Sequence, residues 1–315
     1  MSELELEFEQ LQQNLPGWVR ASQPCSAHGR VAAYIPELSK APGEALGIHL
    51  IDAQGRTLTA GDSSLSFTMQ SISKVFTLIL ALIDNGEKKV FSKVGMEPTG
   101  DNFNSMLKLE LVRPGIPFNP LINAGAIAVS SIIGGDSPDE KSSRVLQFFR
   151  KLAHNDSLDY DYEVYRSESD TANLNRSMGY LLKDNGVLEG DVDDVLDVYF
   201  KHCSINATCA DLSRMALVLA FNGTDPITGE NLIPRRYVQI AKTFMTTCGM
   251  YNASGEFAIQ VGLPAKSGVS GGILSMVPGR YGIGVIGPAL NAKGNSIAGV
   301  QLLETMSQQM DWSLF

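Results

Sequence analysis

The longest apolar stretch of the chain lies in residues 67–84, and its pattern predicts a buried helix. Residues 75–83 are apolar on every side, and a helix that has no polar face is normally buried. Gly86 follows and provides a stop for the helix. Ser71 and Lys74 stand three positions apart near its beginning, so on a helix their side chains share one face. We therefore expect a central helix that holds a hydroxyl and an amine side by side.

The segments before this helix predict one more helix and a hairpin. Residues 3–15 carry apolar side chains at helical spacing, and a short link at residues 16–17 follows. Residues 45–51 and 56–60 are two β-like runs around a glycine-bearing turn, which is the pattern of a β-hairpin.

The segments after the central helix predict a helical middle region and a different ending. The middle region contains helical patterns at residues 138–154, 174–183, 192–202, 209–221 and 234–247. Residues 271–277 and 281–286 then predict two strands joined by a Pro-Gly turn, and residues 295–312 predict a final amphipathic helix with Asn and Ser caps.

This order of elements predicts an α/β (α+β) fold in one domain that spans residues 1–315. An α/β lobe with an antiparallel sheet and flanking helices would take residues 1–70 and 262–315, and a helical lobe would take residues 71–261. The Ser71 helix would lie between the two lobes, where pockets prefer to form.

Composition limits the classes of partner. The net charge is −9, from 34 acidic and 25 basic residues, and no long Lys/Arg block occurs. We therefore expect neither nucleic acid nor a membrane as a partner. The acidic beginning of the chain lacks the pattern of a secretory signal, so we interpret the four cysteines as free thiols in a reducing cytoplasm. The four histidines show no metal-ligand spacing, and we expect no metal and no other cofactor.

Ser71 and Lys74 form a Ser-x-x-Lys motif, which can carry out acyl transfer. A serine hydroxyl is a poor nucleophile until a base takes its proton. A free lysine is charged, but burial and a nearby second cation both favour its neutral form. Lys266, in Lys-Ser-Gly just before the first late strand, could be that cation. The same strand could offer a backbone N–H group to an oxyanion.

Other polar groups leave alternatives open. The GxGxxG pattern at residues 282–287 is followed by Pro288 and opens no helix, so we interpret it as a glycine-tolerant strand and not as a dinucleotide site. Residues 119–127 could form a capped turn or a ligand site. Residues 167–170 could cap a helix or bind a ligand. Tyr199 would normally be a core residue, whereas Tyr251, in an expected loop, could expose its hydroxyl.

Several longer segments carry a family resemblance. They are Tyr34-Ile-Pro, Gln70-Ser-Ile-Ser-Lys74, Asn119-Pro-Leu-Ile-Asn-Ala-Gly-Ala-Ile127, Ser167-Glu168 with Asn175, Tyr199-Phe with Cys203-Ser, Cys248-Gly-Met-Tyr251, and Gly262-Leu-Pro-Ala-Lys-Ser-Gly-Val269. Together they resemble the serine-dependent glutaminase family over nearly the whole chain. That family hydrolyses L-glutamine to L-glutamate and ammonia, and its fold is similar to that of β-lactamases and penicillin-binding proteins.

The resemblance implies a role for each of these residues. Ser71 would be the nucleophile, Lys74 would take its proton with help from Tyr251, and Lys266 would support the pair. The backbone N–H groups of Ser71 and Val269 would hold the oxyanion. The substrate would be bound by Glu168 at its α-ammonium group, with further contacts from Tyr34, Asn123, Asn175 and Tyr199. The family also implies a homo-oligomer, a dimer or a tetramer, and a place in glutamine catabolism and glutamate biosynthesis.

Two other functions share parts of this pattern. A penicillin-recognising serine hydrolase, either a β-lactamase or a peptidase, also carries Ser-x-x-Lys and Lys-Ser-Gly. It usually has a Ser-x-Asn or Tyr-x-Asn element, which Tyr251-Asn252-Ala253 does not match. A non-catalytic amino-acid sensor on the same fold would keep Glu168 but could lose Ser71 or Lys74. The presence of both favours an enzyme.

Overall fold

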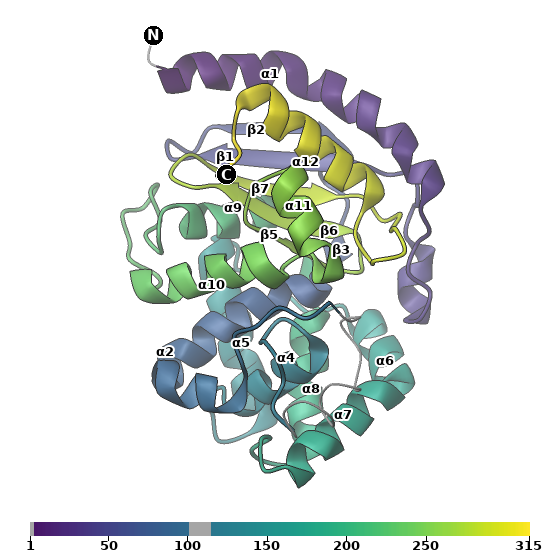
Figure 1. The fold of residues 1–315 in the computed structure, drawn as a ribbon, viewed down its shortest axis with the longest axis vertical. Helices are drawn as coiled ribbons and strands as arrows, with labels where there is room; N and C mark the ends of the chain where they lie inside the picture. Colours follow the sequence, from purple (N-terminus) through teal and green to yellow (C-terminus); the bar gives the residue numbers. More distant parts are fainter. Residues whose placement is uncertain (1–2, 101–114) are drawn as a thin grey trace.

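The computed structural model describes residues 3–100 and 115–315, and these form a β-sheet packed beside a group of helices (Figure 1). In the described chain the sheet has five strands in the order β2-β1-β7-β6-β5, and every neighbouring pair is antiparallel. The strands are β1 (Gly47–Asp52), β2 (Thr57–Gly61), β5 (Ala265–Ser267), β6 (Gly272–Val277) and β7 (Tyr281–Ile286). The prediction of an α/β fold with an antiparallel sheet is confirmed.

Helices cover both faces of this sheet. Helices α1 (Glu3–Ser22) and α12 (Ile297–Met310) pack together over one face, where Leu11, Ile283 and Leu302 share a buried cluster (Figure 1). On the other face lies α9 (Cys209–Ala220), which contacts β7, β6 and β1.

The glycines of the GxGxxG pattern allow this close approach of α9. A Cβ atom at Gly282 would lie 2.0 Å from the Ser213 carbonyl oxygen, and one at Gly284 would lie 2.2 Å from that of Cys209. A side chain at either position would therefore push the helix off the sheet. The pattern serves helix–sheet packing in β7.

The second group of elements surrounds α2 (Ser73–Lys93), whose Phe76, Ile79 and Leu82 are fully buried. The other helices are α4 (Asn123–Ser131), α5 (Pro138–Ala153), α6 (Tyr162–Thr171), α7 (Asn173–Asp184), α8 (Val192–Cys203), α10 (Arg235–Cys248) and α11 (Ser254–Gln260). Short elements complete the described chain: β3 (Phe67–Thr68), β4 (Asn206–Ala207), and the 3₁₀ helices η1 (Gln23–His28), which contacts α1 and α12, η2 (Pro36–Lys40), η3 (Gln70–Ile72) and η4 (Tyr251–Ala253). Helix α9 belongs by sequence to the predicted helical lobe, residues 71–261, but it lies against the sheet. The division of the chain into two lobes therefore remains a prediction.

One local prediction is wrong, one is confirmed in part, and one helix was not predicted. The link at Pro16 and Gly17 lies inside α1, because Leu11, Leu15 and Val19 bury one face of a continuous helix, and this packing overrides the helix-breaking residues. Gly86, with a φ of +73° and a ψ of 168°, interrupts the helical conformation at the predicted position, and a second helical segment continues from there to Lys93. Helix α6 was not anticipated, because its polar sequence resembles a cap and a loop.

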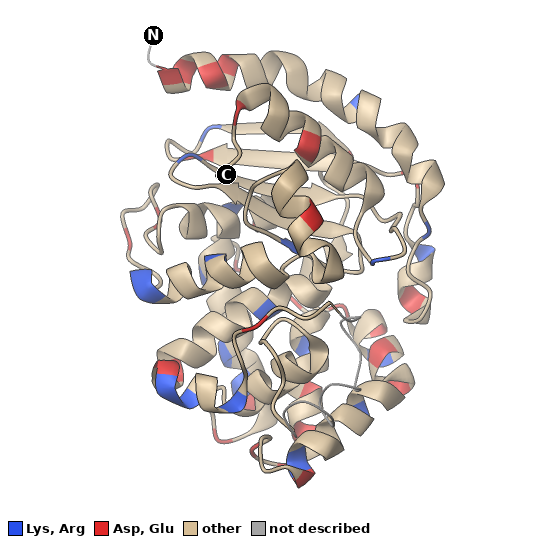
Figure 2. Cartoon of the chain, viewed as in Figure 1, with Lys and Arg blue, Asp and Glu red and all other residues tan. Residues whose placement is uncertain are grey.

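Charge and apolar length add two observations. Acidic residues gather in the first turn of α1 (Figure 2). Within the ranges that the structure describes, no helix combines the length and the apolar character needed to cross a membrane.

Candidate active site

The Ser71 hydroxyl lies where the sheet meets the helices. Ser71 belongs to η3, one short turn before α2, and is 7% exposed. The residue before it, Gln70, has a φ of +47°, so the chain bends sharply just ahead of Ser71. The loop after β5 packs tightly against this bend, because a Cβ atom at Gly268 would lie 2.7 Å from the Met69 carbonyl oxygen. Glycine therefore lets the Lys-Ser-Gly segment approach Ser71.

Lys74 is buried in the first turn of α2 and bonds to neutral oxygens. Its Nζ donates to Asn123 Oδ1 at 2.6 Å and to the Leu121 carbonyl at 3.4 Å. The same nitrogen lies 5.9 Å from the centre of the Tyr199 ring. Burial lowers the pKa of Lys74 to about 8, although the nearby Cys203 and Glu168 oppose this shift. A substantial fraction of the amine is therefore neutral in mildly alkaline solution.

Lys266 is a second buried amine, carried by β5. Its Nζ donates to the carbonyl of Ser267 at 2.6 Å and to that of Gly249 at 3.1 Å, and lies 4.3 Å from the centre of the Tyr251 ring. Burial, reinforced by the positive charge of Lys74, holds the pKa of Lys266 well below its ordinary value. The positive charge of Lys74 therefore disfavours the charged form of Lys266.

Tyr251 begins η4 and is buried, so the interpretation of an exposed loop hydroxyl is wrong. Its hydroxyl donates to the Ser267 carbonyl at 3.1 Å and is also hydrogen-bonded to Ser71. Burial raises its pKa, while the bond to Ser71 lowers it. Because the tyrosine proton is directed at a carbonyl, the phenol oxygen can accept the proton of Ser71.

A cavity of about 90 Å³ opens beside Ser71. Six of the residues that the resemblance assigns to the substrate line it: Tyr34, Ser71, Asn123, Glu168, Asn175 and Tyr199. Sequence reasoning did not assign the others: Ile35, Gln70, Thr171, Ala172, Leu174 and Cys203. Three of these, Ile35, Gln70 and Cys203, stood inside the matched segments, where Tyr34, Ser71 and Tyr199 could have pointed to them. We call this space the inner cavity.

Glu168 contributes to the wall of the inner cavity a carboxyl group in which one oxygen lacks a hydrogen-bond partner among the described residues. It is 6% exposed, and its Oε2 has no hydrogen-bond partner among the described residues. Burial raises the pKa of Glu168 to about 7, although Lys74 and the Gln70 side chain lower it. Asn123 and Asn175 are joined by a 3.1 Å bond from Nδ2 to Oδ1. The wall therefore offers an acceptor to a cation and amide groups to a polar ligand.

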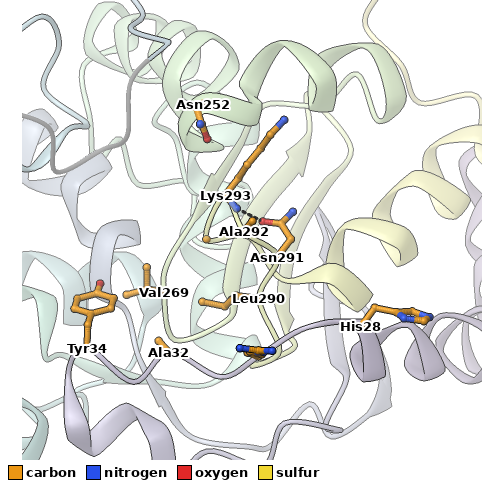
Figure 3. Close-up of a pocket in the computed structure, with 11 residues that line it drawn as sticks. His28, Ala32, Tyr34, Asn252, Val269, Leu290, Asn291, Ala292 and Lys293 are labelled. Atoms are coloured by element: carbon orange, nitrogen blue, oxygen red, sulfur yellow. Dashed lines mark hydrogen bonds between the residues drawn. The ribbon is translucent and has the colours of Figure 1, made fainter.

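A larger pocket of about 490 Å³ adjoins the inner cavity, and we call it the outer pocket. Tyr34 lines both spaces, and Val269 lines the outer one. Figure 3 shows these two residues near one end of the outer pocket and His28 near the other. The exposed Tyr34 side chain therefore stands between the inner cavity and the outer pocket.

Across residues 3–100 and 115–315, no three His, Cys, Asp or Glu side chains gather as a metal site would require.

Comparison with known proteins gives one consistent family. A sequence model of the family "Glutaminase" matches residues 29–315. A glutaminase from Alkaliphilus metalliredigens is 57% identical over 287 residues, which cover 91% of this chain and 94% of that protein. The crystal structure of a probable glutaminase from Bacillus subtilis has a TM-score of 0.91 at 41% identity and covers 97% of this chain and 98% of its own.

Another structure shows a Bacillus subtilis glutaminase in covalent complex with 5-oxo-L-norleucine, formed by its reaction with 6-diazo-5-oxo-L-norleucine. It has a TM-score of 0.89 at 41% identity and covers 96% of this chain and 99% of that one. These neighbours confirm the predicted β-lactamase-like fold. With the family model and the relatives in agreement over nearly its full length, the chain belongs to the glutaminase family.

Proposed function

We propose that this protein hydrolyses L-glutamine to L-glutamate and ammonia through a γ-glutamyl ester on Ser71. The observation that carries the proposal is the inner cavity. In this cavity the Ser71 hydroxyl, which is hydrogen-bonded to Tyr251, lies together with the unpartnered carboxylate oxygen of Glu168. Family membership supports the choice of glutamine.

Glu168 recognises the α-ammonium group of the substrate in this proposal. A buried carboxylate is costly unless a cation or hydrogen-bond donors complete it, and an ammonium group would do both. Asn123, Asn175 and Tyr199 bind the α-amino and α-carboxylate groups from the same wall. The side-chain amide of glutamine then reaches Ser71 while its charged end stays anchored.

Acylation begins when the Ser71 hydroxyl attacks the amide carbon. The Ser71 proton passes to neutral Lys74, whose pKa is lowered by burial, with assistance from Tyr251, and Lys266 supports this pair from β5. The backbone N–H groups of Ser71 and Val269 stabilise the oxyanion. The C–N bond breaks, the leaving nitrogen takes a proton and departs as ammonia, and water then hydrolyses the ester to release glutamate.

The covalent complex of the Bacillus subtilis protein supports an acyl-enzyme route in this family. The test is ammonia release from L-glutamine, measured with a coupled enzyme, beside hydrolysis of nitrocefin by the same preparation. We expect ammonia release and no nitrocefin hydrolysis. Hydrolysis of nitrocefin alone would favour a penicillin-recognising hydrolase, and no reaction with either would favour an amino-acid sensor.

The proposal includes two finer points about the protein in the cell. We place it in the cytoplasm, which the four free cysteines Cys25, Cys203, Cys209 and Cys248 support. We also propose a homo-oligomer, most simply a tetramer, on the resemblance to the family. Sedimentation equilibrium of the purified chain tests the second point, and a monomer at micromolar concentration would overturn it.

A further inference from the structure

Two active-site residues share an unusual backbone conformation. Gln70 has a φ of +47° and Tyr251 a φ of +56°, in the left-handed region that residues other than glycine rarely enter. Each of them begins a 3₁₀ helix, η3 or η4. Such strain costs free energy and persists only where the surroundings hold it in place. The structure must therefore contain contacts that hold these two residues.

A serine three residues further along holds each of them. Ser73 Oγ donates to the Gln70 carbonyl at 2.7 Å, and Ser254 Oγ donates to the Tyr251 carbonyl at 2.8 Å. Both serines are buried, and each is the first residue of an α-helix, α2 or α11. The same local arrangement thus sets the direction of Tyr251 and of Ser71, which directly follows Gln70.

On the Ser71 side, a buried histidine extends this arrangement. His202, from α8, places its Nδ1 2.7 Å from Ser73 Oγ and its Nε2 3.2 Å from Ser130 Oγ. Burial, reinforced by the charge of Lys74, lowers the pKa of His202 to about 3, so the ring is neutral and carries one N–H.

Ser73 and Ser130 each lie within hydrogen-bonding distance of a carbonyl as well as of the ring, and since the ring has one N–H, one serine must give up its carbonyl bond to donate to the ring. We assign the ring proton to Nδ1, because this keeps the shorter bond, from Ser73 to the Gln70 carbonyl at 2.7 Å, and gives up the bond from Ser130 to the Ala126 carbonyl at 2.9 Å. Ser73 then accepts from the histidine. Nε2 then accepts from Ser130, whose hydroxyl can turn toward it from the Ala126 carbonyl.

We propose that Ser73 and His202 are positioning residues for the nucleophile. His202 donates to Ser73, Ser73 donates to the Gln70 carbonyl, and this chain of bonds keeps Gln70 in its left-handed conformation. The bend then presents both the hydroxyl and the backbone N–H of Ser71 to the inner cavity. This inference rests on the proposed function, in which Ser71 attacks the substrate.

The chain contains a matched arrangement without strain. Ser213 Oγ, on α9, donates to the Ala210 carbonyl at 2.9 Å and lies 2.7 Å from Nδ1 of His49, on β1. Ser213 is as deeply buried as Ser73. Ala210, however, lies within a regular helix and is not among the described residues with a positive φ. Removal of the Ser213 hydroxyl therefore deletes the same bonds without releasing a strained residue.

The test compares Ser73→Ala with Ser213→Ala in steady-state glutamine hydrolysis and in thermal unfolding. We expect both changes to lower the melting temperature. Only Ser73→Ala should lower kcat, by roughly ten- to hundred-fold, because misplacement of a reacting group by about 1 Å can cost that much. Its KM should change little, since the substrate-binding side chains remain. Equal kcat values for the two variants would overturn the proposal.

A second pair of variants decides the matter if Ser73→Ala does not fold. His202→Asn keeps an amide N–H near the position of Nδ1, whereas His202→Leu keeps none. We expect His202→Asn to retain more kcat than His202→Leu, and equal losses would contradict the assigned role of Nδ1. Ser71→Ala is measured in the same assay. Activity in that variant would remove the proposed nucleophile, whereas an inactive Ser71→Ala with a fully active His202→Leu would remove only the positioning role.

Discussion

Two buried acidic residues, Asp225 in the loop after α9 and Glu168 in the inner cavity, have opposite surroundings. We call the region around Asp225 the framework. Asp225, in the loop after α9, is bound by the Arg214 guanidinium, by the Thr228 hydroxyl and by the Ile227 N–H group. These donors overcome burial and lower its pKa to about 2. Glu168 is equally inaccessible, but its Oε2 has no described partner and its pKa is raised to about 7. The framework surrounds its carboxylate with donors, whereas the inner cavity leaves one carboxylate oxygen of Glu168 without a described partner, as the proposed binding of an ammonium group requires.

The cations of the two regions differ in whether a carboxylate is bonded to them, although Nη1 of Arg214 has no hydrogen-bond partner among the described residues. Arg214 is paired with Asp225. Lys74 donates to the neutral oxygens of Asn123 and Leu121, and its pKa falls to about 8. An amine that bonds to neutral oxygens can lose its proton near neutral pH, and a paired guanidinium cannot. The site around the inner cavity therefore contains a carboxyl group and an amine, those of Glu168 and Lys74, that are not paired with a bonded opposite charge.

The largest expected effect comes from removal of the nucleophile. Ser71→Ala should abolish glutamine hydrolysis while the fold and the Asp225–Arg214 pair stay intact. Turnover is measured by ammonia release, and folding by circular dichroism. A folded variant that retains more than about a few per cent of the wild-type kcat would sink the assignment, since loss of a nucleophile normally costs far more.

Lys74→Arg should be almost as severe. Arginine stays charged and cannot accept the Ser71 proton, so kcat should fall by roughly a hundred-fold or more, as expected for loss of a general base. Lys93→Arg, on the same helix and in an ion pair with Glu189, is the matched control and should keep wild-type kcat. An active Lys74→Arg enzyme would show that another group is the base.

Glu168→Gln should affect binding and positioning together. Loss of one partner of a desolvated ion pair costs roughly 2–5 kcal/mol, and about 1.4 kcal/mol corresponds to a tenfold change. We therefore expect kcat/KM for glutamine to fall roughly thirty-fold or more, with no loss of melting temperature. Unchanged kinetics with a lower melting temperature would instead make Glu168 a helix-capping residue.

Asp225→Asn should show the reverse behaviour and the smallest kinetic effect. The change leaves the Arg214 charge buried and unpaired, so the free energy of unfolding should fall by about 3 kcal/mol. Because the folded-state pKa of Asp225 is depressed to about 2, this deficit is complete at neutral pH and disappears as pH falls through that value. Urea unfolding at several pH values measures it. A large loss of kcat/KM would mean that the two regions are not independent.

Much of the lining of the inner cavity could be predicted from the sequence, because the residues proposed to be functional stand in long distinctive segments. Tyr34, Asn123, Glu168, Asn175 and Tyr199 come from separate elements, and the fold brings them to one cavity with Ser71. Strands β1, β2, β6 and β7 and most of the helices followed their apolar patterns, whereas β5, which carries Lys266, was not predicted. The prediction of an exposed loop at Tyr251 was wrong, because the buried η4 turn is held by a local bond from Ser254 to Tyr251 and by a long-range bond from Asn295 to Met250.

The positioning role of Ser73 and His202 could not have been predicted from the sequence. The left-handed conformation of Gln70 has no residue signature, since glycine or asparagine is the usual choice there. His202 stands 129 positions from Ser73, so only the packing of α8 against η3 and α2 joins them. Long-range hydrogen bonds of this kind leave no periodic pattern in the chain.

The protonation state of Glu168 during substrate binding tests the central claim most directly. It can be followed in the Ser71→Ala variant, which would bind L-glutamine without hydrolysing it. At pH 6 the Glu168 carboxyl, with its pKa raised to about 7, is mostly protonated, and its acid C=O band can be identified in infrared difference spectra by its absence from the Ser71→Ala/Glu168→Gln variant. We predict that L-glutamine abolishes this band, because the bound ammonium group favours the carboxylate. A band that persists at saturating L-glutamine would contradict the account.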